Sequence, residues 1–260
     1  MRTAQVQGEL WGARAQDWAE IGEGVSRPLY EVVLRKIEVS PATTVLDMGC
    51  GAGAFCALAA RCDAKVSGLD AAASLLAIAQ QQVAHGDFRV GEIEDLPYAD
   101  NSFDVVTAFN SIQYAATPLN ALKEARRVAC PGANVVVATW GKREDSEAAA
   151  LLATIGLLLP PPPPGTPGPF ALSAEGALEA LAREAGLTPT HVEDVACPFV
   201  YPDQETALRG LLSAGPATRA IQAVGEDRVR AVIVNNLPPF KQASGGYRLE
   251  HTFRYLITMA

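Results

Sequence analysis

The chain has 260 residues, of which 49% are hydrophobic and 19% charged, so it is long enough to bury a globular core. Its formal net charge of −8 argues against a nucleic-acid partner, because proteins that bind the phosphate backbone usually present a basic surface. The longest apolar run, residues 148–159, is far shorter than the roughly 20 residues that cross a membrane, and the N-terminus lacks the apolar core of a signal peptide. These features predict a cytoplasmic protein without a nucleic-acid or membrane partner.

The five cysteines form neither a CxxC pair nor a cluster with histidine. An odd number of cysteines in such a chain predicts free thiols, and no metal site is expected.

Residues 9–37 have helical hydrophobic spacing and carry Trp11 and Trp18 on one face. Two interpretations are open. The segment either covers the sheet as an ordinary helix, or forms an N-terminal lid over a cofactor and a substrate, with Trp18 and Tyr30 facing the pocket. Two tryptophans so close together favour the lid.

Strands and helices alternate along the rest of the chain. Apolar, β-branched runs predict strands at residues 43–46, 64–69, 87–90, 103–110, 133–140, 191–201 and 247–259. Helical spacing predicts helices at residues 54–60, 71–84, 118–129, 147–159, 172–184, 207–212 and 217–235. This alternation is typical of an α/β fold with a doubly wound parallel sheet. A run of prolines, residues 160–164, imposes an extended connection that is either a surface spacer or the edge of a substrate cap.

The stretch TVLDMGCGAG is a strand, a glycine-rich turn and the approach to a helix, and glycines let backbone N–H groups come close to a ligand. Gly49, Gly51 and Ala54 fit the dinucleotide pattern GxGxxA. Asp47 and Gly53 extend the same turn into an acidic-x-GxGxG loop, which resembles that of class I S-adenosylmethionine (SAM) methyltransferases. The glycines alone do not distinguish the two cofactors.

Asp47 favours SAM. A carboxylate directly before the glycines would repel an anionic pyrophosphate, whereas it suits the ammonium and sulfonium groups of SAM. Asp70 ends the next expected strand, where a carboxylate can accept hydrogen bonds from ribose hydroxyls, and it fits either cofactor.

A longer block, residues 91–140, reads GEIEDLPYADNSFDVV and continues to KEARRVACPGANVVVATW. It resembles the corresponding stretch of small-molecule class I SAM methyltransferases related to menaquinone and ubiquinone C-methyltransferases. The resemblance implies a Rossmann-like sheet of seven strands with the last strand antiparallel, helical cap elements, and SAM as cofactor with S-adenosylhomocysteine as product.

Carried over by position, the resemblance implies a cofactor site in which Glu92 accepts from the adenine amino group, where relatives usually have aspartate. The implied cofactor-binding residues are Asp47, Gly49, Cys50, Gly51, Gly53, Asp70, Ala71, Glu92, Ile93, Asn110 and Ser111.

An apolar, aromatic pocket for a small organic acceptor is also expected. Its candidate residues are Trp11, Trp18, Tyr30, Gln113, Tyr114, Trp140 and Tyr201. The methyl group of SAM is already activated, so the protein mainly has to align the acceptor and exclude water. No general base is identified, and His251 is expected to be a core histidine of the last strand.

The predicted function is SAM-dependent methylation of carbon, oxygen or nitrogen in a small organic acceptor, in bacterial secondary or quinone-type metabolism. Two alternatives stay open: the same fold could bind SAM but catalyse a cyclisation or rearrangement, or it could be a non-catalytic binding module. An NAD-dependent oxidoreductase ranks below these.

The expected organisation is a single domain over residues 1–260. It comprises an N-terminal helical lid (1–40), a cofactor-binding core (41–141) and cap insertions at 142–190 and 202–246 around the remaining strands.

Overall fold

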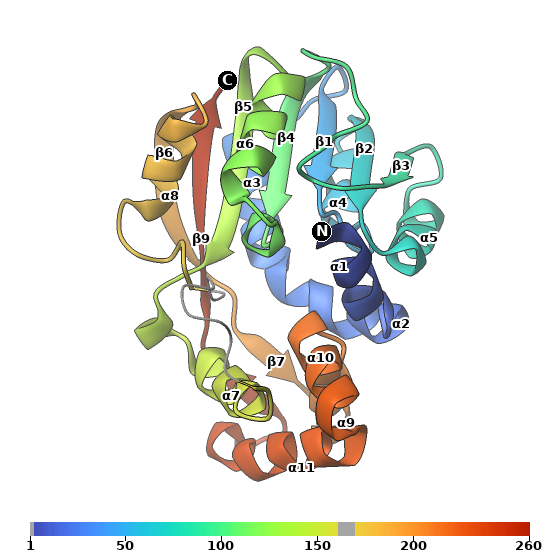
Figure 1. Cartoon of the computed structure of the whole chain (residues 1–260), viewed down its shortest axis with the longest axis vertical. Coiled ribbons are helices and arrows are strands. Elements are labelled where there is room, and N and C mark those ends of the chain that lie inside the picture. Colours follow the sequence, from blue (N-terminus) through green and yellow to red (C-terminus); the bar gives the residue numbers. More distant parts are fainter. Residues whose placement is uncertain (1–2, 161–169) are drawn as a thin grey trace.

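The computed structural model describes residues 3–160 and 170–260. Its main sheet contains β1 (Thr44–Met48), β2 (Lys65–Asp70), β3 (Asp87–Val90), β4 (Phe103–Phe109), β5 (Ala129–Trp140), β6 (Thr188–Ala196) and β9 (Thr252–Met259). These seven strands lie in the order β3–β2–β1–β4–β5–β9–β6 (Figure 1). β9 runs antiparallel to its neighbours β5 and β6, and the other neighbouring strands pair in parallel. The predicted Rossmann-like sheet with an antiparallel last strand is confirmed.

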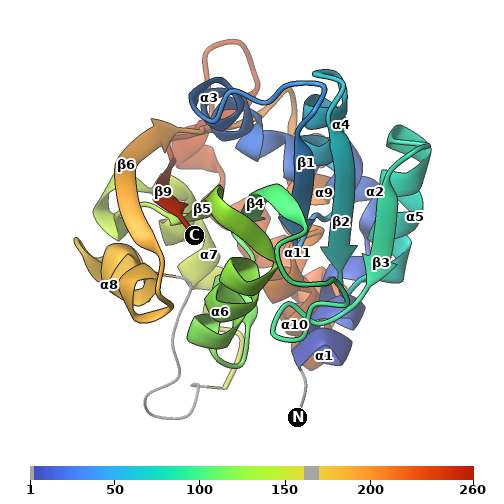
Figure 2. The ribbon, with the colours of Figure 1, turned by 90° about the horizontal axis from the view of Figure 1, so that it is seen from above.

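Helices cover both faces of this sheet (Figure 2). One face carries α3 (Arg27–Lys36), α4 (Ala54–Ala60) and α5 (Ala73–Gln82), and the other carries α6 (Pro118–Val128) and α8 (Ala177–Glu184). Side chains alternate between the two faces, so Val45 belongs to the same core cluster as Phe55 of α4, and Leu46 to that of Leu122 of α6. Burial on both faces explains why the strands read as continuous apolar runs.

The N-terminal segment is helical but irregular. It consists of α1 (Thr3–Gly12), α2 (Ala15–Asp17), a π-helical turn η1 (Trp18–Gly22) and a 3₁₀ turn η2 (Glu23–Ser26) that leads into α3. The Ser74 hydroxyl of α5 donates to the Gly12 carbonyl oxygen at 2.9 Å, which ties the end of α1 to the sheet layer.

A second group of elements forms the cap, the lower part of the molecule in Figure 1. It contains α7 (Glu147–Gly156), α9 (Gln204–Leu212), α10 (Gly215–Val224), α11 (Glu226–Asn236) and a ribbon of β7 (Phe199–Tyr201) with β8 (Tyr247–Leu249). Short 3₁₀ turns connect these regions, namely η3 (Ile112–Tyr114), η4 (Arg143–Asp145) and η5 (Pro238–Phe240). α10 contacts α1, so the cap and the N-terminal segment meet.

Several boundaries differ from the sequence prediction. The helix expected at residues 217–235 is two helices, α10 and α11, which meet at Gly225, where φ is 85°. Residues 191–201 and 247–259 each form two strands instead of one, and the breaks lie side by side, because the Cys197 N–H donates to the His251 carbonyl oxygen at 2.8 Å. The β7–β8 ribbon thereby leaves the main sheet and reaches the cap. The helix expected from residue 172 begins at Ala177, since the Ser173 hydroxyl donates to the Trp140 carbonyl oxygen at 2.7 Å and does not cap the helix.

The expected cap insertion at 142–190 is also divided. α7 joins the cap, whereas α8 packs against α6, β6 and β9. Most of the proline run, residues 161–164, lies outside the described residues. In the described part of the chain, no helix combines the length and apolar character that a membrane crossing requires.

Candidate active site

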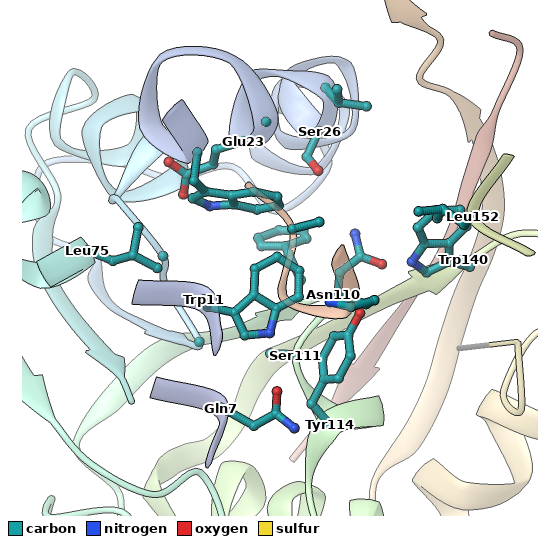
Figure 3. A pocket seen from close by; sticks show the side chains of 18 of the residues that line it. Gln7, Trp11, Glu23, Ser26, Leu75, Asn110, Ser111, Tyr114, Trp140 and Leu152 are labelled. Atoms are coloured by element: carbon teal, nitrogen blue, oxygen red, sulfur yellow. The ribbon is translucent and has the colours of Figure 1, made fainter. Parts of the chain in front are cut away.

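A cavity of about 490 Å³ lies at the carboxyl ends of β1, β2 and β4, between the N-terminal segment and the cap. One part is bounded by the glycine loop and the ends of β2 and β3, and the opposite part by α7 and Trp140 (Figure 3). Doubly wound sheets bind their ligands at the carboxyl ends of the strands. The cavity therefore has the position expected of a ligand site.

The glycine loop turns sharply beside this cavity. Gly49 and Gly51 have φ of 78° and 57°, a region that favours glycine. A Cβ at Gly49 would lie 2.4 Å from the Ser111 Cβ, and one at Gly51 would lie 2.7 Å from the Glu23 Oε1. Glycine at both positions thus allows the loop backbone to pack closely against Ser111 and Glu23 while it lines the cavity.

Asp70 is held beside this loop by backbone donors. The Gly51 N–H donates to its Oδ2 at 2.9 Å, and the Ala72 N–H donates to its Oδ1 at 2.8 Å. Burial raises the pKa of the Asp70 carboxyl, although these N–H groups oppose the shift. Each oxygen retains a lone pair for a further donor, and both Asp70 and Ala71 line the cavity.

Asp47 occupies a different position from the one expected of a direct ligand. It is buried beneath the loop and does not line the cavity. Its Oδ1 accepts a hydrogen bond from the Thr107 hydroxyl at 2.7 Å, and the Cys56 Sγ lies 4.0 Å from its Oδ2. Burial raises the pKa of the Asp47 carboxyl to about 7, with the Thr107 hydrogen bond acting in the opposite direction.

Three other sequence-predicted residues do not line the cavity. Cys50 is buried, and its Sγ lies on the side of Gly68. Gly53 packs against Ala79 of α5. The side-chain amide of Gln113 is buried with neither polar atom hydrogen-bonded within the described residues.

At the β3 end of the cavity, Glu92 and Ile93 both line the wall. The Glu92 Oε2 accepts from the Ala4 N–H at 2.9 Å and from the Thr3 hydroxyl at 3.3 Å. The carboxylate expected to meet an adenine amino group therefore also holds the first turn of α1. Gly8 of α1 lies directly on Ala71, since a Cβ there would be 2.4 Å from the Ala71 carbonyl oxygen.

Four of the predicted aromatic residues make ring contacts at the edge of the cavity. Trp11 contacts Trp18 edge-to-face with ring centroids 4.8 Å apart, and Tyr114 at 5.5 Å. Tyr30 packs against Phe109 at 4.8 Å. Trp11, Trp18, Tyr30 and Tyr114 all line the cavity.

The end of β4 contributes polar groups. Asn110 has φ of 51° and its N–H donates to the Ala138 carbonyl oxygen at 2.9 Å. The Ser111 hydroxyl donates to the Met48 carbonyl oxygen at 2.7 Å, which fixes the turn after β4 against the glycine loop. The Asn110 Oδ1 is buried without a hydrogen-bond partner in the described chain, so this residue has an acceptor to offer to a ligand.

The part of the cavity beneath the cap is mostly apolar. Trp140, Leu152, Phe170 and Tyr201 line it, and Trp140 meets Phe170 edge-to-face at 5.3 Å. Arg143 lies at the rim, with its guanidinium 6.0 Å from the centre of the Phe170 ring. This chamber suits an apolar or aromatic molecule.

His251 lies behind Trp140 and outside the cavity, in the break between β8 and β9. Its Nδ1 is 2.7 Å from the Ser146 hydroxyl, and burial lowers the pKa of the imidazole to about 4. It is a neutral core histidine, as expected, although it lies between two strands and not within one.

Glu23 was not predicted from the sequence. It lines the cavity from η2, is only 4% exposed, and its Oε2 has no hydrogen-bond partner among the described residues. Burial raises the pKa of the Glu23 carboxyl to about 8, opposed by the backbone N–H groups of Ala54 and Ala52 and reinforced by Asp47 and Asp70. An acidic residue in a helical segment usually faces solvent. Apart from the two flanking glycines, nothing in the sequence indicated that Glu23 is buried at the cavity.

Comparisons with known proteins agree with this geometry. Residues 46–137 match the family model described as a methyltransferase domain. A malonyl-[acyl-carrier protein] O-methyltransferase of Erwinia pyrifoliae is 28% identical over 211 residues, which cover 81% of this chain and 76% of that protein. A ubiquinone/menaquinone biosynthesis C-methyltransferase of Geotalea daltonii is 32% identical over 123 residues, which cover 44% of this chain and about half, 52%, of that protein.

Among solved structures, the YcgJ protein of Bacillus subtilis matches with a TM-score of 0.59 and 19% identity, over 88% of this chain and 97% of that chain. These similarities support a class I SAM-dependent methyltransferase, and so an enzyme. Within the described residues, no group of three or more histidine, cysteine, aspartate or glutamate side chains is arranged to hold a metal ion.

Proposed function

We propose that this enzyme transfers the methyl group of SAM to carbon, oxygen or nitrogen of a small organic acceptor. The observation that carries the proposal is the single cavity that joins the glycine-loop edge of the sheet to the apolar chamber beneath the cap. A cofactor and an acceptor can share this space with their reacting atoms in contact, which is the main requirement for transfer of an activated methyl group.

The residues around the loop fit SAM in charge and shape. Glu23, Asp47 and Asp70 form no ion pair with a basic side chain in the described chain, so this edge of the cavity has an excess of acidic groups. Buried carboxylates need a cationic or donating partner, and SAM carries an ammonium group, a sulfonium group and a ribose diol. Gly49 and Gly51 leave room for its close approach.

In the proposed binding mode, Asp70 accepts from the ribose hydroxyls, Ala71 packs beside the adenine, and Ile93 meets the adenine ring with its backbone N–H. When bound, SAM supplies a methyl group activated by its sulfonium. Trp11 and Trp18 cover this position and exclude water from the cavity. Asp47 acts from beneath the loop by its charge and not by direct contact.

The acceptor is proposed to lie beneath the cap, against Trp140 and Leu152. The O- and C-methyltransferase names of the two relatives support methylation, and the ubiquinone/menaquinone name supports a small acceptor of quinone-type metabolism. Bacterial secondary metabolism is the other setting that we propose. The net charge of −8 supports a small molecule over a nucleic acid, and a cytoplasmic location is part of the proposal.

Calorimetry with SAM, S-adenosylhomocysteine and NAD tests the cofactor. We expect SAM and S-adenosylhomocysteine to bind with micromolar affinity and Asp70→Ala to weaken the binding of both strongly. Binding of NAD alone would refute the proposal. Incubation with methyl-labelled SAM and a panel of apolar acceptors then tests the reaction. Label appearing in an acceptor supports methylation, whereas an acceptor converted while the label stays on SAM would point to the cyclisation or rearrangement alternative.

A further inference from the structure

Glu23 presents a buried carboxyl to the cofactor side of the cavity. The side chain is 4% exposed, and one of its oxygens lacks a hydrogen-bond partner within the described residues. Its other oxygen would lie 2.7 Å from a Cβ at Gly51, so the carboxyl lies directly against the glycine loop. In Figure 3, Glu23 lies on the opposite side of the cavity from Trp140 and Leu152, with Asn110 and Tyr114 between them.

The irregular helix explains how an acid of the lid reaches this place. The Glu23 N–H donates to the Trp18 carbonyl oxygen, a bond across five residues that defines the π turn. Residues five apart would diverge on a regular α-helix, whereas here both the Glu23 Oε1 and the Trp18 Nε1 approach Gly51. π turns are costly and occur often at functional sites.

The groups that face Glu23 are acidic or neutral. They come from each of the surrounding elements: Asp47 of β1, Asp70 of β2, Tyr30 of α3 and Cys56 of α4. No arginine or lysine of the described chain forms an ion pair with Glu23. The two arginines nearest to it in sequence, Arg14 and Arg27, pair with Glu226 and Glu31 instead. The donors to Glu23 within the described chain are the backbone N–H groups of Ala52 and Ala54. A buried carboxyl in this setting stays protonated until a cation reaches it, and a bound ligand can supply that cation.

We propose that Glu23 binds the α-ammonium group of the methionine part of SAM, so that the N-terminal lid contacts the cofactor directly through this residue. The assignment rests on the proposed function and deepens it. In the proposed binding mode the ribose lies at Asp70 and the adenine at Ala71 and Ile93, which leaves the methionine part for the glycine loop. The ammonium is favoured over the reacting methyl because Glu23 lies against this loop and not in the apolar chamber.

Proton release accompanies this contact. Burial raises the pKa of the Glu23 carboxyl to about 8, so the protonated form predominates at pH 7 in the ligand-free protein. An ammonium group in contact favours the carboxylate, and the proton is released to solvent. Asp47 and Asp70 also have raised pKa values, so a smaller release from them remains in any Glu23 variant.

The experiment is calorimetry at pH 7 in two buffers of different ionisation enthalpy, with three ligands. SAM and S-adenosylhomocysteine carry the ammonium group, whereas 5′-methylthioadenosine lacks the amino-acid part. In Glu23→Gln we expect SAM and S-adenosylhomocysteine to bind about 10- to 100-fold more weakly, and methylthioadenosine to bind as in the wild type. Proton release on SAM binding should fall by at most about one proton per protein.

Two further variants make the test specific. Glu23→Asp keeps the charge on a shorter side chain, so it should retain proton release while binding SAM less tightly. Glu31→Gln is the matched control, because Glu31 is exposed on α3 and pairs with Arg27 at the surface; it should change nothing.

Equal weakening of all three ligands in Glu23→Gln would overturn the assignment, because it would mean that Glu23 shapes the pocket. Unchanged SAM binding with a lower rate of methyl transfer would also overturn it and point to a proton-transfer role. A wild-type protein that binds neither SAM nor S-adenosylhomocysteine would instead overturn the proposed function itself, together with this assignment.

Discussion

The Glu92 carboxylate accepts the backbone N–H of Ala4 at 2.9 Å, which joins the first turn of α1 to the loop after β3 across 88 residues of chain. The same carboxylate lines the cavity where the adenine of a bound cofactor is proposed to lie. The first turn of a helix leaves its N–H groups without intrahelical partners, so an acceptor at this position stabilises the helix and its attachment to the loop after β3.

Glu92→Ala should therefore loosen the N-terminal lid. We expect faster amide hydrogen exchange over α1 and a loss of docking free energy of about 1–2 kcal/mol, with weaker SAM binding as a consequence. Glu9→Gln, an exposed position of the same helix, is the control and should exchange as the wild type does. Unchanged exchange in Glu92→Ala would show that other contacts hold the lid, such as the Ser74–Gly12 hydrogen bond.

Gly51→Ala should abolish SAM binding. The φ of 57° is unfavourable for alanine by about 1–2 kcal/mol, and the new Cβ would lie 2.7 Å from the Glu23 Oε1. Gly132→Ala provides a matched comparison, because Gly132 has φ of 79° but no atom within 4 Å of its Cβ position. Both variants should lower the melting temperature, while calorimetry should detect lost SAM binding in Gly51→Ala alone. Equal binding by the two variants would contradict the close contact at the loop.

The stability of the ligand-free protein should depend on pH through Glu23. Its pKa in the folded state, about 8, lies above its ordinary value of 4.5, so the folded state holds the proton more tightly than the unfolded state does. This contribution is fully present below about pH 4.5 and is lost as the pH rises through 8.

Glu23→Gln removes the ionisable group. Compared with the wild type, this variant should be similar in stability at pH 5 and more stable at pH 8.5, with a difference on the order of 3 kcal/mol. Urea unfolding at the two pH values measures it. A wild type as stable as Glu23→Gln at pH 8.5 would mean that the carboxyl has a partner when ionised.

Leu152→Trp should separate acceptor binding from cofactor binding. Leu152 lines the chamber beneath the cap and is half-buried, so a larger side chain reduces the chamber without filling a closed core. We expect the affinity for SAM to stay within about threefold of the wild type, because a substitution mainly affects the residues packed around it. The methylation rate of any acceptor found by screening should fall at least tenfold. A parallel loss of SAM affinity would show that the two compartments are not independent.

Several features follow from local sequence and could be predicted. The strands of the main sheet were predicted from apolar runs because parallel strands are buried on both faces, as Val45 and Leu46 show. Gly49, Asp70 and Ala71 were expected at the cofactor side, and they line the cavity because strand ends and glycine turns are specified by residues close together in the chain. Trp11 and Trp18 were expected from helical spacing to face the pocket, and both line the cavity.

Other features depend on long-range packing. Asp47 was expected to meet the cofactor directly, yet its carboxyl turns beneath the loop to Thr107 of β4, a neighbour only in the folded sheet. The last strand is interrupted at His251, which is hydrogen-bonded to Cys197 in the interruption of the neighbouring strand, about fifty residues earlier in sequence. The sequence of either strand alone therefore does not predict the interruption.

The amino-acid sequence by itself determined the sheet, the glycine loop and the class of enzyme, because hydrophobic periodicity and turn glycines act over a few residues. Only the tertiary structure decided which acids surround the cofactor position. A π turn in the N-terminal segment directs Glu23 onto Gly51, and the burial of its carboxyl there arises from α3, α4 and the lid packing together. The position and burial of this carboxyl are thus properties of the assembled fold and not of a local motif.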